Sequence, residues 1–266
     1  MCYNSNMKPY FDFTKTALGA KYCYTRKPVI DEREIHTYHE ILYYIDGNAT
    51  FICDGYSKKL APNTLILIPK ESYHFFKLDE PKNFERLKIS FSSLDGFEEL
   101  LRRSFSSIRV FSELRDTQKS LLDSLCRNLS ESTDKVKDRA TVTGSLLLLL
   151  SSLDTGDDEH PANERGRLAA DILEYVGKNV SSPLDTATVA RALGVSPSTV
   201  SHTFKSEMGI SLHKYVTQKR IALATSMLTD GNSPTKIYSD CGFSDYSSFY
   251  KAYVRIMGRS PSSKDD

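Results

Sequence analysis

Acidic, imidazole and phenol side chains alternate along one stretch near the start of the chain: Glu34, His36, Tyr38, Glu40 and Tyr44. Alternate residues of a β-strand point to the same face, so a strand through this stretch would gather these side chains on one surface. Carboxylate and imidazole groups bind divalent iron, manganese or zinc, and they also accept hydrogen bonds from hydroxyl groups. The stretch is therefore a candidate binding site.

A second candidate site follows from a pattern that occurs twice toward the end of the chain, over Leu184–Gly209 and again over Ser233–Gly258. Each copy predicts a short helix, a turn that contains glycine, and a second helix. In the first copy Asp185 is a candidate N-cap, Gly194 ends the first helix, and Ser196 followed by a proline begins the second.

The second helix of the first copy separates apolar from polar residues. Val200 and Phe204 face the domain core, whereas the opposite face carries polar side chains at i, i+3, i+4 and i+7. These are Ser198, Ser201, His202 and Lys205. Such a stripe suits the major groove of double-stranded DNA, where base edges offer hydrogen-bond donors and acceptors beside the phosphates.

The second copy repeats this arrangement with more aromatic residues. We expect Ser244 to cap its second helix and Phe249 and Tyr253 to be buried. The outward or flanking residues are then Tyr246, Ser247, Tyr250 and Lys251. An amphipathic segment, Leu212–Leu228, would hold the two copies at a fixed separation.

The rest of the chain divides by the spacing of its apolar residues. Residues 1–111 contain short runs of Tyr, Ile, Phe and Thr separated by Asp-Gly turns, which predicts a β-sandwich or barrel. Leucines at three- and four-residue steps predict two antiparallel helices over 112–153. An acidic stretch with Gly and Pro over 154–164 predicts a linker, and 165–266 predicts an all-α domain. The fold class is therefore α+β.

Composition narrows the function without assigning it. The chain has 39% hydrophobic and 26% charged residues, as a globular protein does. Its five scattered cysteines favour free thiols over a disulfide framework or a zinc site. No apolar run approaches the roughly 20 residues that cross a bilayer, and the first ten residues lack a signal core, so we expect a cytoplasmic protein without a membrane partner.

The C-terminal part resembles the DNA-binding domain of the AraC/XylS family of bacterial transcription regulators, from about Arg167 to Pro261. The residues that carry the resemblance are Ala190, Leu193, Gly194, Ser196, Phe204, Lys205, Gly209, Ile210, Arg220, Ala224, Leu228, Ile237, Gly242, Phe243, Ser244, Asp245, Ser248, Phe249, Gly258, Arg259, Ser260 and Pro261. The resemblance implies that two recognition helices enter successive major-groove segments on one face of the DNA. The chain departs from the pattern at Thr186, Tyr238 and Ser262–Lys264.

The N-terminal part resembles the two motifs of the cupin barrel. The stretch through His36 and Glu40 and the later stretch Asn63, Pro69, Glu71, His74 keep the motif spacing, although Glu34 stands where the motif has histidine, and Asn63 and Glu71 where it has glycine. The resemblance implies that His74 joins the first group inside a barrel. It also implies that sensing domains of this kind keep such residues without a metal and use them to bind a small molecule.

We therefore expect a sequence-specific transcription regulator, not an enzyme, that binds promoter DNA in response to a small molecule such as a sugar. The expected effector contacts are Glu34, His36, Tyr38, Glu40, Tyr44 and His74, with no cofactor, and the helical connector would form a homodimer. Two alternatives stay open. One is a metal-binding cupin enzyme fused to a DNA-binding domain, and the other is a module that binds a protein such as RNA polymerase.

Overall fold

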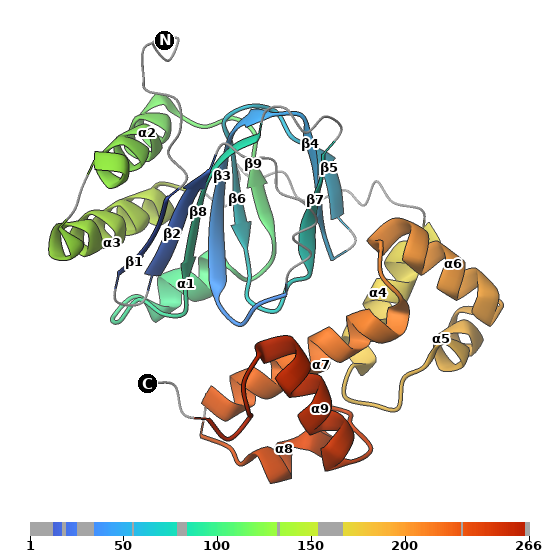
Figure 1. Cartoon of the computed structure of the whole chain (residues 1–266). Helices are drawn as coiled ribbons and strands as arrows, with labels where there is room; N and C mark the ends of the chain where they lie inside the picture. Colours follow the sequence, from blue (N-terminus) through green and yellow to red (C-terminus); the bar gives the residue numbers. More distant parts are fainter. Residues whose placement is uncertain are drawn as a thin grey trace.

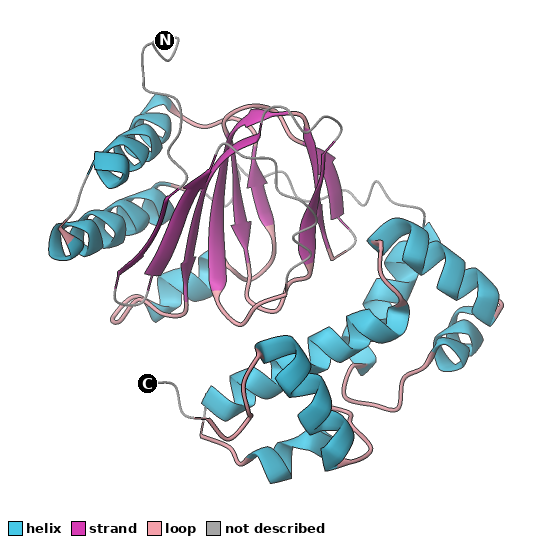
Figure 2. Cartoon of the chain, viewed as in Figure 1, coloured by secondary structure: helices cyan, strands magenta, loops and turns pink. Residues whose placement is uncertain are grey.

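The computed structural model describes residues 13–17, 20–25, 35–54, 56–78, 84–131, 134–153, 167–229 and 231–263. Glu34 and the predicted linker, 154–164, lie outside these ranges, as do the last three residues. Within them an N-terminal sheet-rich domain is followed by a C-terminal helical domain (Figures 1 and 2). The predicted α+β fold class is confirmed.

The strands form two antiparallel sheets that face each other. The larger sheet has the order β1-β2-β8-β3-β6-β9 and the smaller one the order β5-β4-β7. The strand bounds are β1 Phe13–Ala17, β2 Ala20–Thr25, β3 His39–Gly47, β4 Ala49–Cys53, β5 Tyr56–Lys59, β6 Thr64–Ile68, β7 His74–Leu78, β8 Phe84–Phe91 and β9 Arg109–Phe111.

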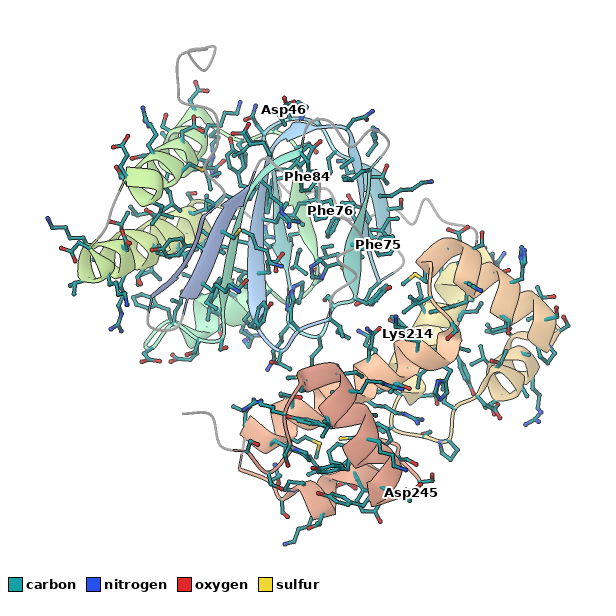
Figure 3. All side chains as sticks on the ribbon, viewed as in Figure 1. Asp46, Phe75, Phe76, Phe84, Lys214 and Asp245 are labelled. Carbon is teal, nitrogen blue, oxygen red and sulfur yellow. The ribbon has the colours of Figure 1, made fainter. Side chains whose placement is uncertain are left out.

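Each central strand of the larger sheet is buried on both faces, because different partners cover the two sides. Leu42 and Tyr44 of β3 point into the interior between the sheets, where they meet Phe51 of the smaller sheet. Ile41 and Tyr43 point the other way, into a core made with the helices. Figure 3 labels Phe76 and Phe84, two further residues of the interior between the sheets.

Three helices cover the outer face of the larger sheet: α1 Glu98–Ser104, α2 Asp116–Glu131 and α3 Lys135–Ser152. The predicted pair of helices with leucines at three- and four-residue steps is α2 and α3, and their buried leucines pack on the sheet residues. Asp134 begins α3 as its N-cap by accepting hydrogen bonds from the backbone N–H groups of Val136 and Lys137.

The C-terminal domain consists of two helix-turn-helix units joined by a long helix. The bounds are α4 Arg167–Asn179, α5 Thr186–Leu193, α6 Pro197–Met208, α7 Leu212–Thr229, α8 Pro234–Asp240 and α9 Tyr246–Met257. The first half of α7 packs with α4, α5 and α6, and its second half packs with α8 and α9. The predicted rod between the units is thus α7, and it belongs to both cores.

Caps and left-handed residues end the helices largely as the sequence predicts. Asp185 accepts a hydrogen bond from the backbone N–H of Thr188, and Gly194, with φ of 67°, ends α5. Ser196 caps α6, and the proline that follows it is the first residue of the helix. One assignment was wrong: Asp245 caps α9, because its carboxylate is the group that accepts from the Ser248 backbone N–H.

The smaller sheet touches the helical domain with its outer face. Ile52 and Phe75, from β4 and β7, pack together with Tyr73 into the core formed by α4, α6 and α7. Figure 3 labels Phe75 on the side of the sheet that faces these helices. The two domains therefore share one apolar cluster.

Candidate functional site

Three of the predicted site residues meet at one end of the barrel. The His36 Nε2 atom lies 3.3 Å from Glu40 Oε2, and the His74 Nε2 atom lies 3.7 Å from Glu40 Oε1. The three side chains are at least nine-tenths buried. His74 is the first residue of β7 and Glu40 the second of β3, so strands of both sheets position the cluster.

The two other predicted residues that the structure describes are Tyr38, which contacts the cluster, and Tyr44, which lies farther along β3. β3 begins only at His39, so the predicted strand through His36 and Tyr38 was wrong at its start. His36 still reaches Glu40, and its ring stacks on that of Tyr38 with centroids 3.9 Å apart. Tyr44 lies farther along the same face of β3, fully buried against Phe84.

Backbone carbonyls orient both imidazoles. His36 Nδ1 lies 2.8 Å from the carbonyl oxygen of Tyr38, and His74 Nδ1 lies 3.2 Å from that of Ser72. A carbonyl oxygen only accepts hydrogen bonds, so each Nδ1 carries the hydrogen and donates it. Each Nε2 is thereby turned toward Glu40.

Glu40 is a buried carboxylate with a charged neighbour. Burial raises the pKa of the Glu40 carboxyl, but contacts with His36 and His74 and the positive charge of Lys88 outweigh burial and hold the pKa well below its ordinary value. The Lys88 Nζ atom lies 3.0 Å from Glu40 Oε2. Glu40 is therefore ionised inside the barrel.

Sequence reasoning missed two cationic residues of the barrel interior, Arg86 and Lys88. They lie on the inner face of β8, and the guanidinium group of Arg86 stands over the ring of Phe84, 5.1 Å from its centroid. The sequence does show that these residues alternate along β8 with Leu87 and Ile89, which face the helices. It does not show which face of the strand points into the barrel.

Two residues that stand where the cupin motif has glycine adopt a backbone conformation typical of glycine. Asn63 and Glu71 have φ of 64° and 65°, in the left-handed region that non-glycine residues seldom adopt. The Glu71 backbone N–H donates a 2.7 Å hydrogen bond to the carbonyl oxygen of His36. The turn that Glu71 makes thus fixes the chain beside the cluster.

The predicted DNA-contacting residues of the first unit lie together on α6. All four of them, Ser198, Ser201, His202 and Lys205, are exposed, whereas Val200 and Phe204 are buried. Of the predicted residues on α9, Ser247, Tyr250 and Lys251 are exposed. Tyr246 differs, because it is half-buried and its ring packs on those of Tyr238 and Phe249.

A cleft of about 640 Å³ separates the two units, and none of the residues that line it is acidic. Arg220 of α7 ties the units together there. Its Nε donates a 2.9 Å hydrogen bond to the carbonyl oxygen of Val180, and its Nη2 donates a 2.8 Å bond to that of Ser182. The residues that line the cleft are Ser181, Pro183, Leu184, His213, Thr217, Arg220, Ser239, Gly242, Phe243, Ser244, Ser248, Lys251, Ala252 and Arg255.

The comparisons with known proteins agree with this architecture. A family described as "AraC-like ligand binding domain" matches residues 23–150, and one described as "Helix-turn-helix domain" matches residues 189–264. The probable transcriptional regulator LumQ of Photobacterium leiognathi is 24% identical, over 85% of this chain and 88% of its own length.

Two operon regulators match over nearly the full length of the chain. The Msm operon regulatory protein of Streptococcus mutans is 24% identical over 95% of this chain and 92% of its own. The raffinose operon transcriptional regulatory protein RafR of Pediococcus pentosaceus is 26% identical over 94% and 90%. These relatives are regulators, not enzymes. No helix in the described parts of the chain is long and apolar enough to cross a membrane.

The order of the structural parts along the chain thus agrees with the order of the two matched families. A barrel with a buried polar cluster and a pair of helices packed on it comes first, and two helix-turn-helix units with exposed polar faces follow. The chain is a transcription regulator of the AraC family, with an AraC-like ligand-binding domain followed by a helix-turn-helix DNA-binding domain.

Proposed function

We propose that this regulator binds a specific promoter sequence through α6 and α9 in response to a small molecule held in the barrel. The observation that carries the proposal is the pair of exposed polar faces on α6 and α9, which the shared helix α7 joins. Ser198, Ser201 and His202 would contact base edges from α6. Ser247, Tyr250 and the half-buried Tyr246 would do so from α9.

Affinity would come mainly from the DNA backbone. Lys205, Lys251 and Arg255 are exposed, and phosphate contacts by such residues release counterions. We therefore expect operator affinity to fall steeply as salt rises. Fluorescence anisotropy of a labelled promoter fragment at several salt concentrations measures this, and an affinity independent of salt would contradict the proposed contacts.

The proposed effector is a carbohydrate. The barrel interior offers the Glu40 carboxylate and the imidazoles of His36 and His74 as acceptors for hydroxyl groups, and the ring of Tyr44 as apolar surface. Glu34 and Tyr38 belong to the same proposed set from the sequence. A relative over most of the chain is named for a raffinose operon. Calorimetric titration with mono- and oligosaccharides tests the idea, and no heat across the panel would remove it.

We propose that ligand binding in the barrel is transmitted to the helical domain through β7 and the turn before it. His74 points into the barrel, while Tyr73 and Phe75 on either side of it pack on the helical domain. A ligand that moves His74 would move its neighbours against α7. Because a ligand shifts an equilibrium only through different affinity for two states, this contact must differ between them.

We further propose a homodimer formed through α3. Its outer face carries Val136, Ala140, Gly144 and Leu148 at four-residue steps, and Val136 and Leu148 are 79% and 62% exposed. Leu148→Glu should convert dimers to monomers in sedimentation velocity, whereas Ser107→Glu, which adds the same charge to an exposed loop, should not. A dimer that survives Leu148→Glu would exclude this seam.

The proposal places the protein in the cytoplasm with the DNA. Contact with RNA polymerase is also proposed, through the connector helices α2 and α3. A footprint at the promoter that needs added polymerase would favour the connector as the primary interaction surface, whereas a footprint by the regulator alone would favour direct reading by α6 and α9.

A further inference from the structure

We propose that the cleft between the two helix-turn-helix units binds the DNA backbone that runs between the two major-groove segments contacted by α6 and α9. His213, Lys251 and Arg255, which line the cleft, would contact its phosphates. This inference rests on the proposed function and deepens it. It assigns a third region of contact with DNA, apart from base reading, and it adds His213 of the joining helix α7 to the interface.

The cleft is lined by basic side chains that come from two helices. The four that line it are His213 and Arg220 of α7 and Lys251 and Arg255 of α9. None of the four forms an ion pair within the described parts of the chain. Asp245, the N-cap of α9, adjoins the lining but is engaged by the hydroxyl groups of two serines. A concave basic surface of this kind attracts a polyanion.

The cleft and the barrel lie on opposite faces of α7. His213 and Arg220 line the cleft and share one face of the helix. Tyr215 and Lys219, which both contact Asp54 of the barrel, lie on the other face. The contact with the barrel therefore leaves the cleft side of α7 available to DNA.

The walls of the cleft are the parts of the two units between which DNA backbone should pass. One wall is the loop before α5, with Ser181, Pro183 and Leu184, and the other is α9. In helix-turn-helix proteins the first helix crosses the DNA backbone while the second enters the major groove. The cleft thus lies between the first helix of one unit and the recognition helix of the other. A duplex held by α6 and α9 at once would carry its intervening backbone along this gap.

The width of the cleft is fixed before DNA binds. Arg220 donates hydrogen bonds to the carbonyl oxygens of Val180 and Ser182 in the loop that forms one wall. Gly242, in the turn before α9, approaches Val180 so closely that a Cβ added there would lie 2.8 Å from its carbonyl oxygen. Because these contacts join the two walls, the cleft binds backbone with little cost of reorganisation.

The test uses the full-length chain and a duplex that it selects from random sequences, with single phosphates replaced by neutral methylphosphonates. Between the two major-groove segments that the chain protects, we expect some replacements to weaken binding several-fold. Each of these should also reduce the slope of log affinity against log salt by about 0.9. Because the change is in the DNA, misfolding of a variant cannot mimic the result.

Arg255→Gln and His213→Gln each remove a contact from one side of the cleft. In each variant at least one of the sensitive methylphosphonates should lose its effect, because its protein partner is gone. Lys214→Gln is the matched control. Lys214, labelled in Figure 3, is an exposed neighbour of His213 on α7 but does not line the cleft. Its response to every methylphosphonate should equal that of the parent chain.

Methylphosphonates without effect between the two segments, or effects that simply add to those of Arg255→Gln and His213→Gln, would overturn the cleft contact. Calorimetric binding of inorganic phosphate together with insensitive methylphosphonates would assign the cleft to a small anion and overturn it too. A chain that selects no preferred duplex would contradict the proposed function itself. A selected duplex protected in two major-groove segments would support that function whatever the cleft binds.

Discussion

At the scale of single residues, the polar stripe of α6 allows contacts with base edges to be tested separately from contacts with the DNA backbone. Changing Ser201 and His202 together to alanine should cost roughly 1 to 3 kcal/mol at the operator, because base-edge contacts are lost, and little on random DNA, where phosphate contacts dominate. Competition titrations with both DNAs measure the difference. Equal losses on both would mean that α6 does not read bases.

Residue roles set by near neighbours in sequence could be predicted, and those set by distant strands could not. Ser196 caps α6 through a backbone N–H only three residues away, so local pattern is sufficient. The pairing of Lys88 with Glu40 depends on β8 lying beside β3, where Glu40 stands opposite Ser90 and Leu42 opposite Lys88. Spacing along the chain carries no such information.

At the scale of elements, Gly242 in the turn before α9 holds the two helix-turn-helix units together. Its φ is 85°, and a Cβ added there would lie 2.8 Å from both Arg220 Nε and the Val180 carbonyl oxygen. Gly242→Ala would therefore break the clamp that Arg220 makes as well as strain the backbone. We expect a loss of at least about 2 kcal/mol in unfolding free energy and weaker operator binding.

Gly194→Ala is the control for this change. Gly194 has φ of 67°, but a Cβ there would meet nothing within 4 Å. The substitution should cost roughly 1 kcal/mol from backbone strain alone. Urea unfolding and operator titration of both variants compare the effects, and similar losses would show that the packing at Gly242 has no special role.

The start of β3 could not be predicted from the sequence, whereas the ends of the helices largely could. The alternation from Glu34 to Tyr44 predicts one continuous strand, yet β3 starts at His39. Instead, the His36 carbonyl oxygen accepts a hydrogen bond from the Glu71 backbone N–H, and the His36 ring stacks on that of Tyr38. The alternation does not predict these contacts with a loop. Helix starts and ends were more predictable, since glycine, proline and capping residues mark them locally.

At the scale of the whole molecule, a small set of polar contacts joins the barrel to the DNA-binding domain. The Tyr215 hydroxyl donates a 2.8 Å hydrogen bond to Asp54 Oδ1. The Lys219 Nζ atom lies 3.2 Å from Asp54 Oδ2 and donates a 2.6 Å bond to the Glu71 carbonyl oxygen. Both domains could be predicted from the sequence, but this joint could not, because its residues lie far apart along the chain.

A double-mutant cycle measures whether the joint couples the domains. Asp54→Asn keeps a residue that tolerates the positive φ of this position, and Tyr215→Phe removes only the hydroxyl. If the bond acts across the interface, their effects on unfolding free energy should be non-additive by about 0.5 to 3 kcal/mol. Each should also reduce the effect of effector on operator affinity. Additive effects and an unchanged response would mean that the contact transmits nothing.

The same joint predicts how the protein responds to alkali. Burial, and then the charge and hydrogen bond of Asp54, raise the pKa of Tyr215 well above its ordinary value of 10, and burial also raises the pKa of Tyr22 and Tyr43. Above pH 10 the unfolded chain releases these protons while the folded chain keeps them, so stability falls as pH rises. Tyr215→Phe should lessen that fall by up to about 1.4 kcal/mol per pH unit. Urea unfolding between pH 9 and 11 measures both slopes, with Tyr250→Phe, at an exposed tyrosine, as the control. Parallel slopes for all three chains would show that Tyr215 ionises as freely when folded as when unfolded.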